Sequence, residues 1–348
     1  MNVAASSSPL SLLLLRDRRA GHFRQSEGVA LALSKRFAVT VTTVACQPPG
    51  FFASRFGRRL LRLAARLSPA LFDRLCGLDL AGVARPELIV SAGADTLAAN
   101  VALARRYTAA NVFIGTVREY PEDAFAAALT IYPSQAVRPR HILTLKPTPF
   151  DPDTLPAPRP VADAGDLAGR EAALFVGGPS GTHRWHADDW RRLEALVRET
   201  GERFGLCWRI TTSRRTPAEA TARLKALADA PFVREVIDFA EAGPGSADRL
   251  FAADILVVTE DSATMAMEAV AARRPVVALC PADRDRSRDD EAIDGLVAER
   301  RLERLELGGA DAADFAAAIA ALSPLEDNPL TRLAGLLLPL LPARFSQG

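Results

Sequence analysis

The stretch DILVVTEDSATMAMEAVAARRPVVAL, residues 254–279, decides the fold class of this chain. Its β-branched start at 255–258 predicts a buried strand, which stops at Thr259-Glu260-Asp261 before small hydroxyl residues begin a helix. A second apolar strand follows Pro275. In a parallel sheet, the turn between such a strand and its helix lies at the carboxyl edge, where ligands bind and the helix N-terminus offers free N–H groups to a phosphate.

Two polar residues of this stretch, Thr264 and Glu268, are four positions apart and therefore share one face of the predicted helix. A carboxylate one turn into such a helix can accept both hydroxyls of a ribose. The alternative is a purely structural strand-helix-strand unit in which Glu268 is only solvated, and the stretch by itself leaves both interpretations open.

The composition is that of a globular protein with no bulk charge. Of 348 residues, 49% are hydrophobic and 24% are charged, and the formal net charge is +1. This balance argues against a dedicated nucleic-acid binder, and the length suits two domains better than one. The four cysteines form no CxxC pair, which fits a reducing compartment. The apolar run at 10–15 is too short for a signal peptide and no window could span a bilayer, so the sequence predicts a cytoplasmic protein.

Short apolar runs alternate with longer amphipathic ones along the whole chain, which predicts an α/β fold with mainly parallel sheets. Eleven strands are expected, near 12–15, 37–43, 88–91, 111–115, 127–131, 141–144, 173–176, 206–212, 233–237, 255–258 and 276–279. They form two Rossmann-like sets.

The expected organisation is two Rossmann-like domains facing a cleft. A first domain at 1–146 is joined to a second at 169–325 by a proline-rich linker at 147–168. A leucine-rich C-terminal helix, at 326–348, is expected to pack back on the domain junction.

In the first domain, the loop RDRRAGHFRQSEG at 16–28 follows the first strand and carries Gly21, His22 and Gln25. Histidine exchanges protons near neutral pH, so His22 is the candidate catalytic base; the alternative is a hydrogen-bonded residue of the helix start. Gly93, in the turn SAGADT at 91–96, is a second candidate for the acceptor side, although helix packing explains that turn nearly as well.

In the second domain, Gly177, Gly178 and Ser180 follow a strand, and the paired glycines allow backbone N–H groups to converge on an anion. The next strand is followed by Ser213, Arg214 and Arg215. Thr216, Pro217 and Glu219 are expected to form a capping box at the start of the following helix, which places both arginines where a diphosphate would lie. Ordinary surface arginines are the alternative.

Two segments bear on metals and membranes. Asp283-Arg284-Asp285 has DxD spacing but lies in an alternating-charge run, and His183 and His186 lack partners at ligand spacing, so no metal is expected. Residues 51–75 interleave aromatic residues, leucines and arginines without an acidic residue before Asp73. This is typical of a helix on an anionic membrane surface, here the inner face of the cell membrane, and equally of an amphipathic helix packed on the first domain.

Five blocks of the chain resemble the bacterial members of the mitochondrial-fission Elm1 family, which are assigned as glycosyltransferases. They are RDRRAGHFRQSEG at 16–28, PELIVSAGADT at 86–96, FVGGPSGTHRW at 175–185, TTSRRTP at 211–217 and VVTEDSATMAMEAVAARRPV at 257–276. The layout is also similar to the GT-B fold. One departure is AFAAALTIYPSQ at 124–135, where the family has FDLV and a His-Asp pair.

The resemblance implies a nucleotide-sugar donor on the second domain, with Asp261 and Ser262 joining the residues named above. It places His22 and Gln25 on the acceptor side. The leading hypothesis is a metal-independent glycosyltransferase that uses a nucleoside diphosphate sugar as substrate, needs no cofactor, and acts on a lipid-linked or envelope glycan such as lipopolysaccharide. The alternatives are a nucleotide-sugar epimerase of the same fold and a non-enzymatic scaffold on a membrane surface.

Overall fold

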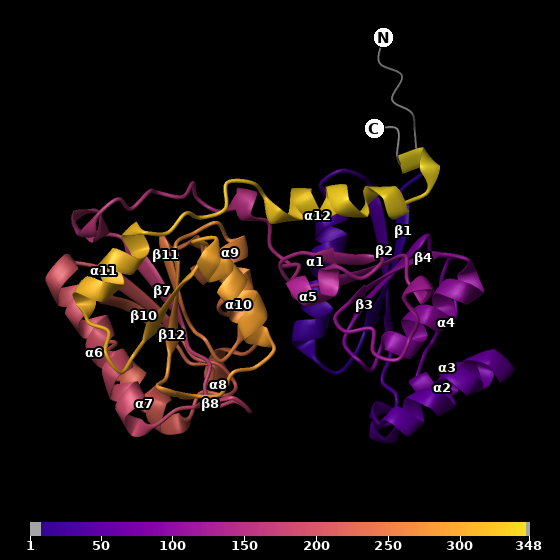
Figure 1. The fold of residues 1–348 in the computed structure, drawn as a ribbon, viewed down its shortest axis with the longest axis horizontal. Helices are drawn as coiled ribbons and strands as arrows, with labels where there is room; N and C mark the ends of the chain where they lie inside the picture. Colours follow the sequence, from indigo (N-terminus) through magenta and orange to yellow (C-terminus); the bar gives the residue numbers. More distant parts are fainter. Residues whose placement is uncertain (1–7, 346–348) are drawn as a thin grey trace, which may run out of the picture. The chain divides into compact units, whose positions relative to one another are not determined.

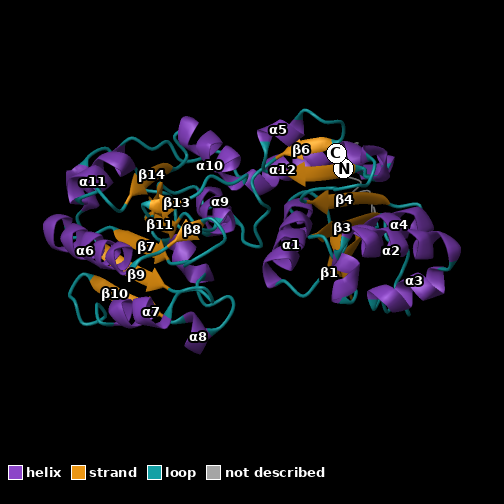
Figure 2. Cartoon of the chain, turned by 60° about the horizontal axis from the view of Figure 1, so that its bottom comes forward, coloured by secondary structure: helices purple, strands orange, loops and turns teal. Residues whose placement is uncertain are grey.

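The computed structural model describes residues 8–345, and the ends of the expected domains at 1–7 and 346–348 lie outside that range. The chain forms two compact units, each built on its own six-stranded sheet (Figures 1 and 2). Unit 1 comprises the chain up to Asp151 and again from Pro329, and unit 2 comprises Pro152–Asn328. The change from unit 1 to unit 2 therefore falls inside the proline-rich segment at 147–168.

The sheet of unit 1 has the order β2-β1-β3-β4-β5-β6, and every neighbouring pair of strands is parallel. Its strands are β1 (Leu10–Arg16), β2 (Val39–Ala45), β3 (Leu88–Ala92), β4 (Ala110–Ile114), β5 (Ala127–Thr130) and β6 (His141–Leu143). Its helices are α1 (Ala20–Ser34), α2 (Arg55–Leu67), α3 (Pro69–Cys76), α4 (Leu97–Tyr107), α5 (Pro133–Ala136) and α12 (Pro329–Leu337).

The two faces of this sheet carry different helices, because alternate residues of a strand point to opposite sides. Leu12 and Leu14 of β1 pack with α1 and α12, whereas Leu13 and Leu15 pack with α2, α3 and α4. The C-terminal segment thus belongs to the core of unit 1. Its last aromatic residue, Phe345, stacks edge-on against Phe37 with 5.1 Å between ring centroids.

Unit 2 repeats the plan with the strand order β10-β9-β7-β11-β12-β14, again parallel throughout. The strands are β7 (Glu171–Phe175), β9 (Cys207–Thr211), β10 (Val233–Ile237), β11 (Ile255–Thr259), β12 (Val276–Cys280) and β14 (Glu303–Glu306); β8 (His183–Arg184) and β13 (Asp283–Arg284) form a separate antiparallel pair. The helices are α6 (Ala187–Phe204), α7 (Ala218–Lys225), α8 (Phe239–Ala242), α9 (Ala263–Ala271), α10 (Asp289–Ala298) and α11 (Ala312–Ala320).

Short 3-10 helices complete both units. They lie at Gly50–Ala53, Glu122–Ala124, Pro152–Thr154, Ala164–Leu167, Asp248–Ala252, Leu338–Leu340 and Ala343–Phe345. The helix at Ala164–Leu167 ties the end of the proline-rich segment to unit 2, because Leu167 is fully buried in the core of that unit.

The α/β fold and all eleven expected strands are confirmed, with bounds within two residues of those expected. Three strands were missed: the two-residue strands β8 and β13, and β14, an edge strand whose sequence ERLE offers only one apolar residue. The predicted capping box was also wrong, since α7 begins at Ala218 with Pro217 as its N-cap.

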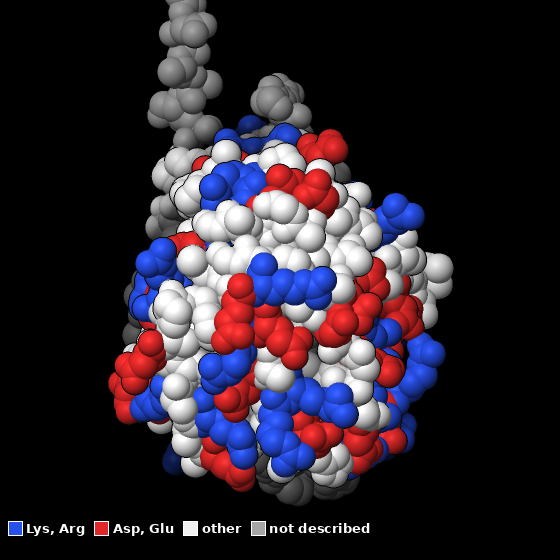
Figure 3. Space-filling view, turned by 90° about the vertical axis from the view of Figure 1, so that its left-hand side faces the viewer, with Lys and Arg blue, Asp and Glu red and all other residues white. Residues whose placement is uncertain are grey.

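The surface carries mixed charge. Over the face of unit 2 seen in Figure 3, basic and acidic side chains alternate without a large patch of one sign. On α6 this arises from ion pairs one turn apart, such as Arg192 with Asp188 at 2.9 Å. Within residues 8–345, none of the helices combines the length and the apolar character needed to cross a bilayer.

Candidate functional site

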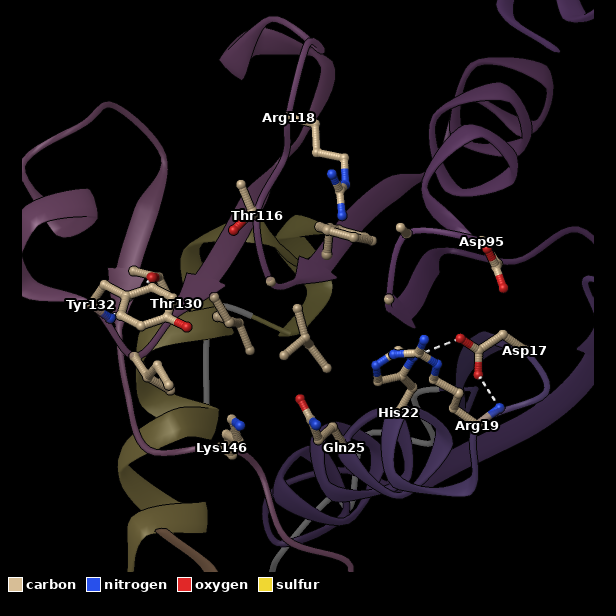
Figure 4. Close-up of a pocket in the computed structure, with 17 residues that line it drawn as sticks. Asp17, Arg19, His22, Gln25, Asp95, Thr116, Arg118, Thr130, Tyr132 and Lys146 are labelled. Atoms are coloured by element: carbon tan, nitrogen blue, oxygen red, sulfur yellow. Dashed lines mark hydrogen bonds and ion pairs between the residues drawn. The ribbon is translucent and has the colours of Figure 1, made fainter. Parts of the chain in front are cut away.

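Unit 1 holds a cavity of about 420 Å³ at the carboxyl edge of its sheet (Figure 4). The loops that follow β1, β3, β4, β5 and β6 all contribute to it. Its lining residues are Asp17, Arg19, His22, Gln25, Gly93, Ala94, Asp95, Phe113, Ile114, Gly115, Thr116, Arg118, Leu129, Thr130, Ile131, Tyr132 and Lys146. Three of the four acceptor-side residues expected from the sequence line it, whereas Gly21 does not.

A carboxylate–imidazole pair lies in this cavity. Asp17 Oδ2 is 2.6 Å from His22 Nδ1, and the Asp17 side chain is only 1% exposed against 28% for His22. The other carboxylate oxygen accepts the Arg19 N–H at 2.9 Å, which fixes the carboxylate in place. Since Nδ1 is engaged by the carboxylate, Nε2 is the ring nitrogen left to exchange a proton with a substrate. The sequence reasoning missed Asp17; its position directly after β1, five residues before His22, was the available signal.

Gly93 makes room for this pair. Its φ is +87°, and a Cβ built there would lie 2.1 Å from His22 Nδ1 and 2.8 Å from Asp17 Oδ2. No side chain fits at that distance. The glycine that was expected to face the acceptor therefore lies directly against the Asp17–His22 pair.

Basic groups outnumber acidic groups among the charged residues that line the cavity. Arg19, Arg118 and Lys146 come from three different loops, whereas the acidic lining residues are Asp17 and Asp95. Gln25 is buried in the wall, where its amide donates to the Gly21 carbonyl at 3.2 Å. Thr130 and Tyr132 come from the segment at 124–135 that departs from the family pattern. The cavity therefore suits an anionic or hydroxyl-rich molecule.

In unit 2, the glycine loop after β7 rests on a buried carboxylate. Gly178 N–H donates to Asp261 Oδ2 at 3.1 Å, and Arg215 Nη2 lies 2.5 Å from the same oxygen. The Asp261 side chain is 0% exposed, and this burial raises its pKa above the ordinary value although Arg215 opposes the shift. Asp261 was expected to face a donor directly. Its burial makes it a positioning residue that holds the glycine loop and the arginine in register.

Neither glycine of this loop can be replaced without a clash. A Cβ on Gly177 would lie 2.1 Å from Asp261 Oδ2, and one on Gly178 would lie 2.2 Å from the Arg215 carbonyl oxygen. Gly177 N–H also donates to Thr259 Oγ1 at 2.7 Å. Close packing therefore requires glycine at both positions, and the N–H groups of both glycines already have acceptors within the protein. Ser180 turns back on its own loop, where its hydroxyl accepts the His183 N–H at 3.1 Å.

Thr216, the predicted N-cap, serves a different purpose. Its hydroxyl donates to the Gly177 carbonyl at 2.6 Å and accepts the Ser213 N–H at 2.8 Å, so it ties the loop after β9 to the loop after β7. Ser213 adds a hydrogen bond of 3.3 Å to the same carbonyl. The arginines beside it differ: Arg215 is held by Asp261, whereas exposed Arg214 makes no hydrogen bond or ion pair with residues 8–345.

The helix α9 begins next to this loop. Ser262 is its N-cap and accepts the Met265 N–H at 3.4 Å. Thr264 and Glu268 are half-buried on α9, one turn apart, as the sequence pattern predicted. The structure therefore brings Gly177, Gly178, Ser213, Arg215 and Asp261 into direct contact and places Ser262 at the adjoining helix start.

One cluster contradicts the expectation that His183 lacks partners. His183, Glu260 and Cys280 are all buried, and their potential ligand atoms lie within 4.8 Å of one another. Burial lowers the pKa of His183 and raises the pKa of the Cys280 thiol. Arg304 lies 2.8 Å from the Glu260 carboxylate and Arg284 lies 3.6 Å from it. These two guanidinium groups already supply positive charge to the carboxylate that a metal ion would use.

Each unit has a parallel sheet, covering helices and polar loops at the carboxyl edge of the sheet. A chain with two such units has the fold of GT-B glycosyltransferases and related epimerases. MurG from Acinetobacter baumannii is 12% identical with a TM-score of 0.53, over 94% of this chain and 99% of that one. The glycosyltransferase SnogD from Streptomyces nogalater is 16% identical with a TM-score of 0.51, over 98% and 96%. The UDP-GlcNAc 2-epimerase from Methanocaldococcus jannaschii is 12% identical with a TM-score of 0.50, over 94% and 99%.

The chain belongs to the family described as mitochondrial fission ELM1, whose model matches residues 20–330. This confirms the resemblance identified from the five sequence blocks. No curated protein sequence matches the chain. The structural likenesses, at these identities, establish the fold.

Proposed function

We propose that this protein is a metal-independent glycosyltransferase that moves a sugar from a nucleoside diphosphate sugar to a hydroxyl of a lipid-linked or envelope glycan. The observation that carries the proposal is the buried Asp17 carboxylate on His22, at the mouth of a polar cavity in a GT-B-type fold. A side chain that can take a proton lies where the sequence family implies the acceptor.

In the proposed reaction, His22 Nε2 removes the proton of the acceptor hydroxyl as its oxygen bonds to the anomeric carbon of the sugar. The bond from that carbon to the diphosphate oxygen breaks, and the nucleoside diphosphate leaves with the electron pair. Asp17 keeps the ring oriented and stabilises the imidazolium that forms. No metal or cofactor is part of this scheme.

The donor is assigned to unit 2. The N–H groups of the α9 start, together with Arg214 and Arg215, would stabilise the diphosphate, and Glu268 with Thr264 would bind the ribose. Exposed Arg214 supports this role, since its guanidinium has no partner within residues 8–345 to give up. Arg215 would bind the diphosphate while it remains paired with Asp261.

The acceptor is assigned to unit 1 and to a membrane surface. The segment at 51–75, which includes α2 and α3, exposes large apolar side chains such as Phe56 and Leu67 beside its arginines. Such a surface favours peripheral binding to an anionic membrane. We therefore propose a cytoplasmic protein that works at the inner face of the cell membrane, where a lipid-linked acceptor is found.

The proposal is tested first by thermal unfolding of the purified protein with UDP, GDP, CMP and dTDP in metal-free buffer. A ligand at a hundred times its dissociation constant should add about 2.7 kcal/mol of stability. We expect one nucleotide to do so and the effect to weaken in Arg214→Gln. Arg234→Gln, which removes an exposed arginine from β10, is the matched control and should keep the full shift.

The other hypotheses predict different results. An epimerase would convert the nucleotide sugar without any acceptor, and this is read directly by chromatography of the donor. A scaffold would bind membranes and show no stabilisation by any nucleotide, which would contradict the proposal. In a transferase, Asp17→Asn should lower turnover while leaving the nucleotide-induced stabilisation unchanged.

A further inference from the structure

The helix α2 exposes a stripe of apolar side chains. Phe56, Leu60, Leu63 and Leu67 follow one another at intervals of four, three and four residues, so they lie on one face, and they are 62%, 37%, 50% and 73% exposed. The buried face lies one residue further along the helix, about 100° around its axis, and packs into unit 1 through Leu61 and Ala64. A globular surface does not usually leave four large apolar side chains in a row in water.

A stripe of arginines runs beside the apolar one. Arg55, Arg59, Arg62 and Arg66 repeat the same spacing one position earlier along the helix. Arg62 lies over the Tyr120 ring, 5.1 Å from its centroid, and donates to the Glu119 carbonyl at 3.3 Å. Among residues 8–345, Arg55, Arg59 and Arg66 make no hydrogen bond or ion pair. Their charges are therefore available to an anion from outside.

The C-terminal half of the arginine stripe borders a cavity of about 430 Å³, whose walls come from α2, α4 and the loop after β4. Arg62 and Arg66 of α2 and Arg105 and Arg106 of α4 all line it. Arg106 is paired with Asp73 at 2.8 Å, whereas Arg105 has no partner within the described residues. None of the lining residues is acidic, and the floor is apolar, with Ala98 and Val101. The helices concerned lie together in unit 1 (Figure 1).

We infer that this cavity binds the phosphate of an anionic membrane lipid, with Arg66 and Arg105 as its principal ligands and the apolar stripe of α2 inserted among the acyl chains. Guanidinium groups form paired hydrogen bonds with phosphate oxygens, and two unpartnered ones line the same cavity here. The apolar neighbours favour a lipid over a free anion, because a free phosphate gains nothing from Leu63 or Leu67. The inference rests on the proposed membrane-surface function and adds to it a defined binding site.

The test is co-sedimentation of the full-length protein with vesicles of phosphatidylcholine alone or mixed with phosphatidylglycerol. The variant Arg66→Gln/Arg105→Gln removes the two unpartnered arginines of the cavity. The matched control, Arg55→Gln/Arg59→Gln, removes the same charge from the same surface but from outside the cavity. A diffuse charge effect predicts equal losses of vesicle binding for the two variants. A binding site predicts at least a tenfold greater loss of vesicle binding for the cavity variant.

A variant that keeps every charge distinguishes binding in the cavity from a general effect of the positive charge. Ala102 lines the cavity, and Ala102→Trp would fill it. We expect this variant to fold, as checked by its thermal transition, and to lose preference for phosphatidylglycerol. Equal losses for the two arginine variants would overturn the inference, as would unchanged binding by a folded Ala102→Trp. Release of the protein from vesicles by millimolar inorganic phosphate would show that the site takes the free anion and would also overturn it.

Failure of this inference is distinguishable from failure of the proposed enzyme function. A protein that is stabilised by a nucleotide but ignores vesicles would remove the lipid site and leave the donor site intact. A protein that binds phosphatidylglycerol vesicles through the cavity but no nucleotide would do the reverse.

Discussion

Replacing Gly93 with alanine should damage unit 1 in a way that depends on His22. The added Cβ would lie 2.1 Å from His22 Nδ1, and the backbone φ of +87° is one that an L-residue adopts only with strain. The imidazole has to move, and movement breaks its 2.6 Å contact with Asp17. Strain costs about 1–2 kcal/mol and loss of a hydrogen bond to a charged group about 1.5–3 kcal/mol, so we expect a destabilisation of about 2.5–5 kcal/mol.

Gly77 provides the matched control, because its φ is +64° and a Cβ there meets nothing within 4 Å. Gly77→Ala should cost only the strain, about 1–2 kcal/mol. The cost of Gly93→Ala should fall by at least about 1.5 kcal/mol in a His22→Ala background, where the imidazole is gone and only Asp17 needs to shift. This coupling is the signature of a direct contact.

The assay has to report on unit 1. All three tryptophans, Trp185, Trp190 and Trp208, belong to unit 2, so their fluorescence follows unit 2 during urea unfolding. Hydrogen exchange of the β1 and β3 amides gives the free energy of opening of unit 1. Equal costs for Gly93→Ala and Gly77→Ala would refute the reasoning, and so would a cost of Gly93→Ala that is the same with and without His22.

Three further predictions concern unit 2. Gly177→Ala, whose Cβ would meet Asp261 at 2.1 Å, should abolish nucleotide-induced stabilisation, whereas Gly181→Ala in the same loop has open space and should retain it; both are read by thermal shift. Arg215→Ala should lower the free energy of unfolding by about 1–3 kcal/mol, because it leaves the Asp261 carboxylate buried without its ion pair, while Arg214→Ala should leave stability unchanged in urea titrations. Burial lowers the pKa of His183, so the unfolded chain takes up a proton at this residue at a higher pH than the folded chain does. Stability is therefore lost as pH falls below about 6.5. His183→Gln should make the urea midpoint depend less on pH between pH 7 and the pKa of His183 in the folded protein.

The strands were predictable from the sequence because buried parallel strands are continuous apolar runs. β11 and β12, which are buried on both faces, had bounds within one residue of those expected. The edge strand β14 could not be recognised as an apolar run, because ERLE contains three charged residues and a single leucine. Pattern recognition thus works where burial is complete and weakens at a sheet edge.

The loops that form the candidate site could be predicted from the sequence, but the contacts between these loops could not. His22 and Gly93 were recognised separately, but nothing in the sequence indicates that β1 lies beside β3, which is what brings them together. Thr216 had every local feature of a helix cap. The carbonyl of Gly177, nearly forty positions away, competes successfully for its hydroxyl. His183, Glu260 and Cys280 likewise come from three segments that only the fold unites.

The two units contain the same local arrangement of an aspartate and a glycine. In unit 1, Asp17 follows β1, and its carboxylate lies against Gly93 from the loop after the neighbouring strand β3. In unit 2, Asp261 follows β11 and lies against Gly177 from the loop after its neighbour β7. Each carboxylate is almost wholly buried and contacts a nitrogen-containing side chain, an imidazole in one case and a guanidinium in the other. A buried carboxylate needs such a partner, and the partner needs a backbone with no Cβ in its way. An aspartate just after one strand, matched with a glycine just after the adjacent strand, is therefore a pattern that fixes a nitrogen-containing side chain at a sheet edge, provided that the strand order is known.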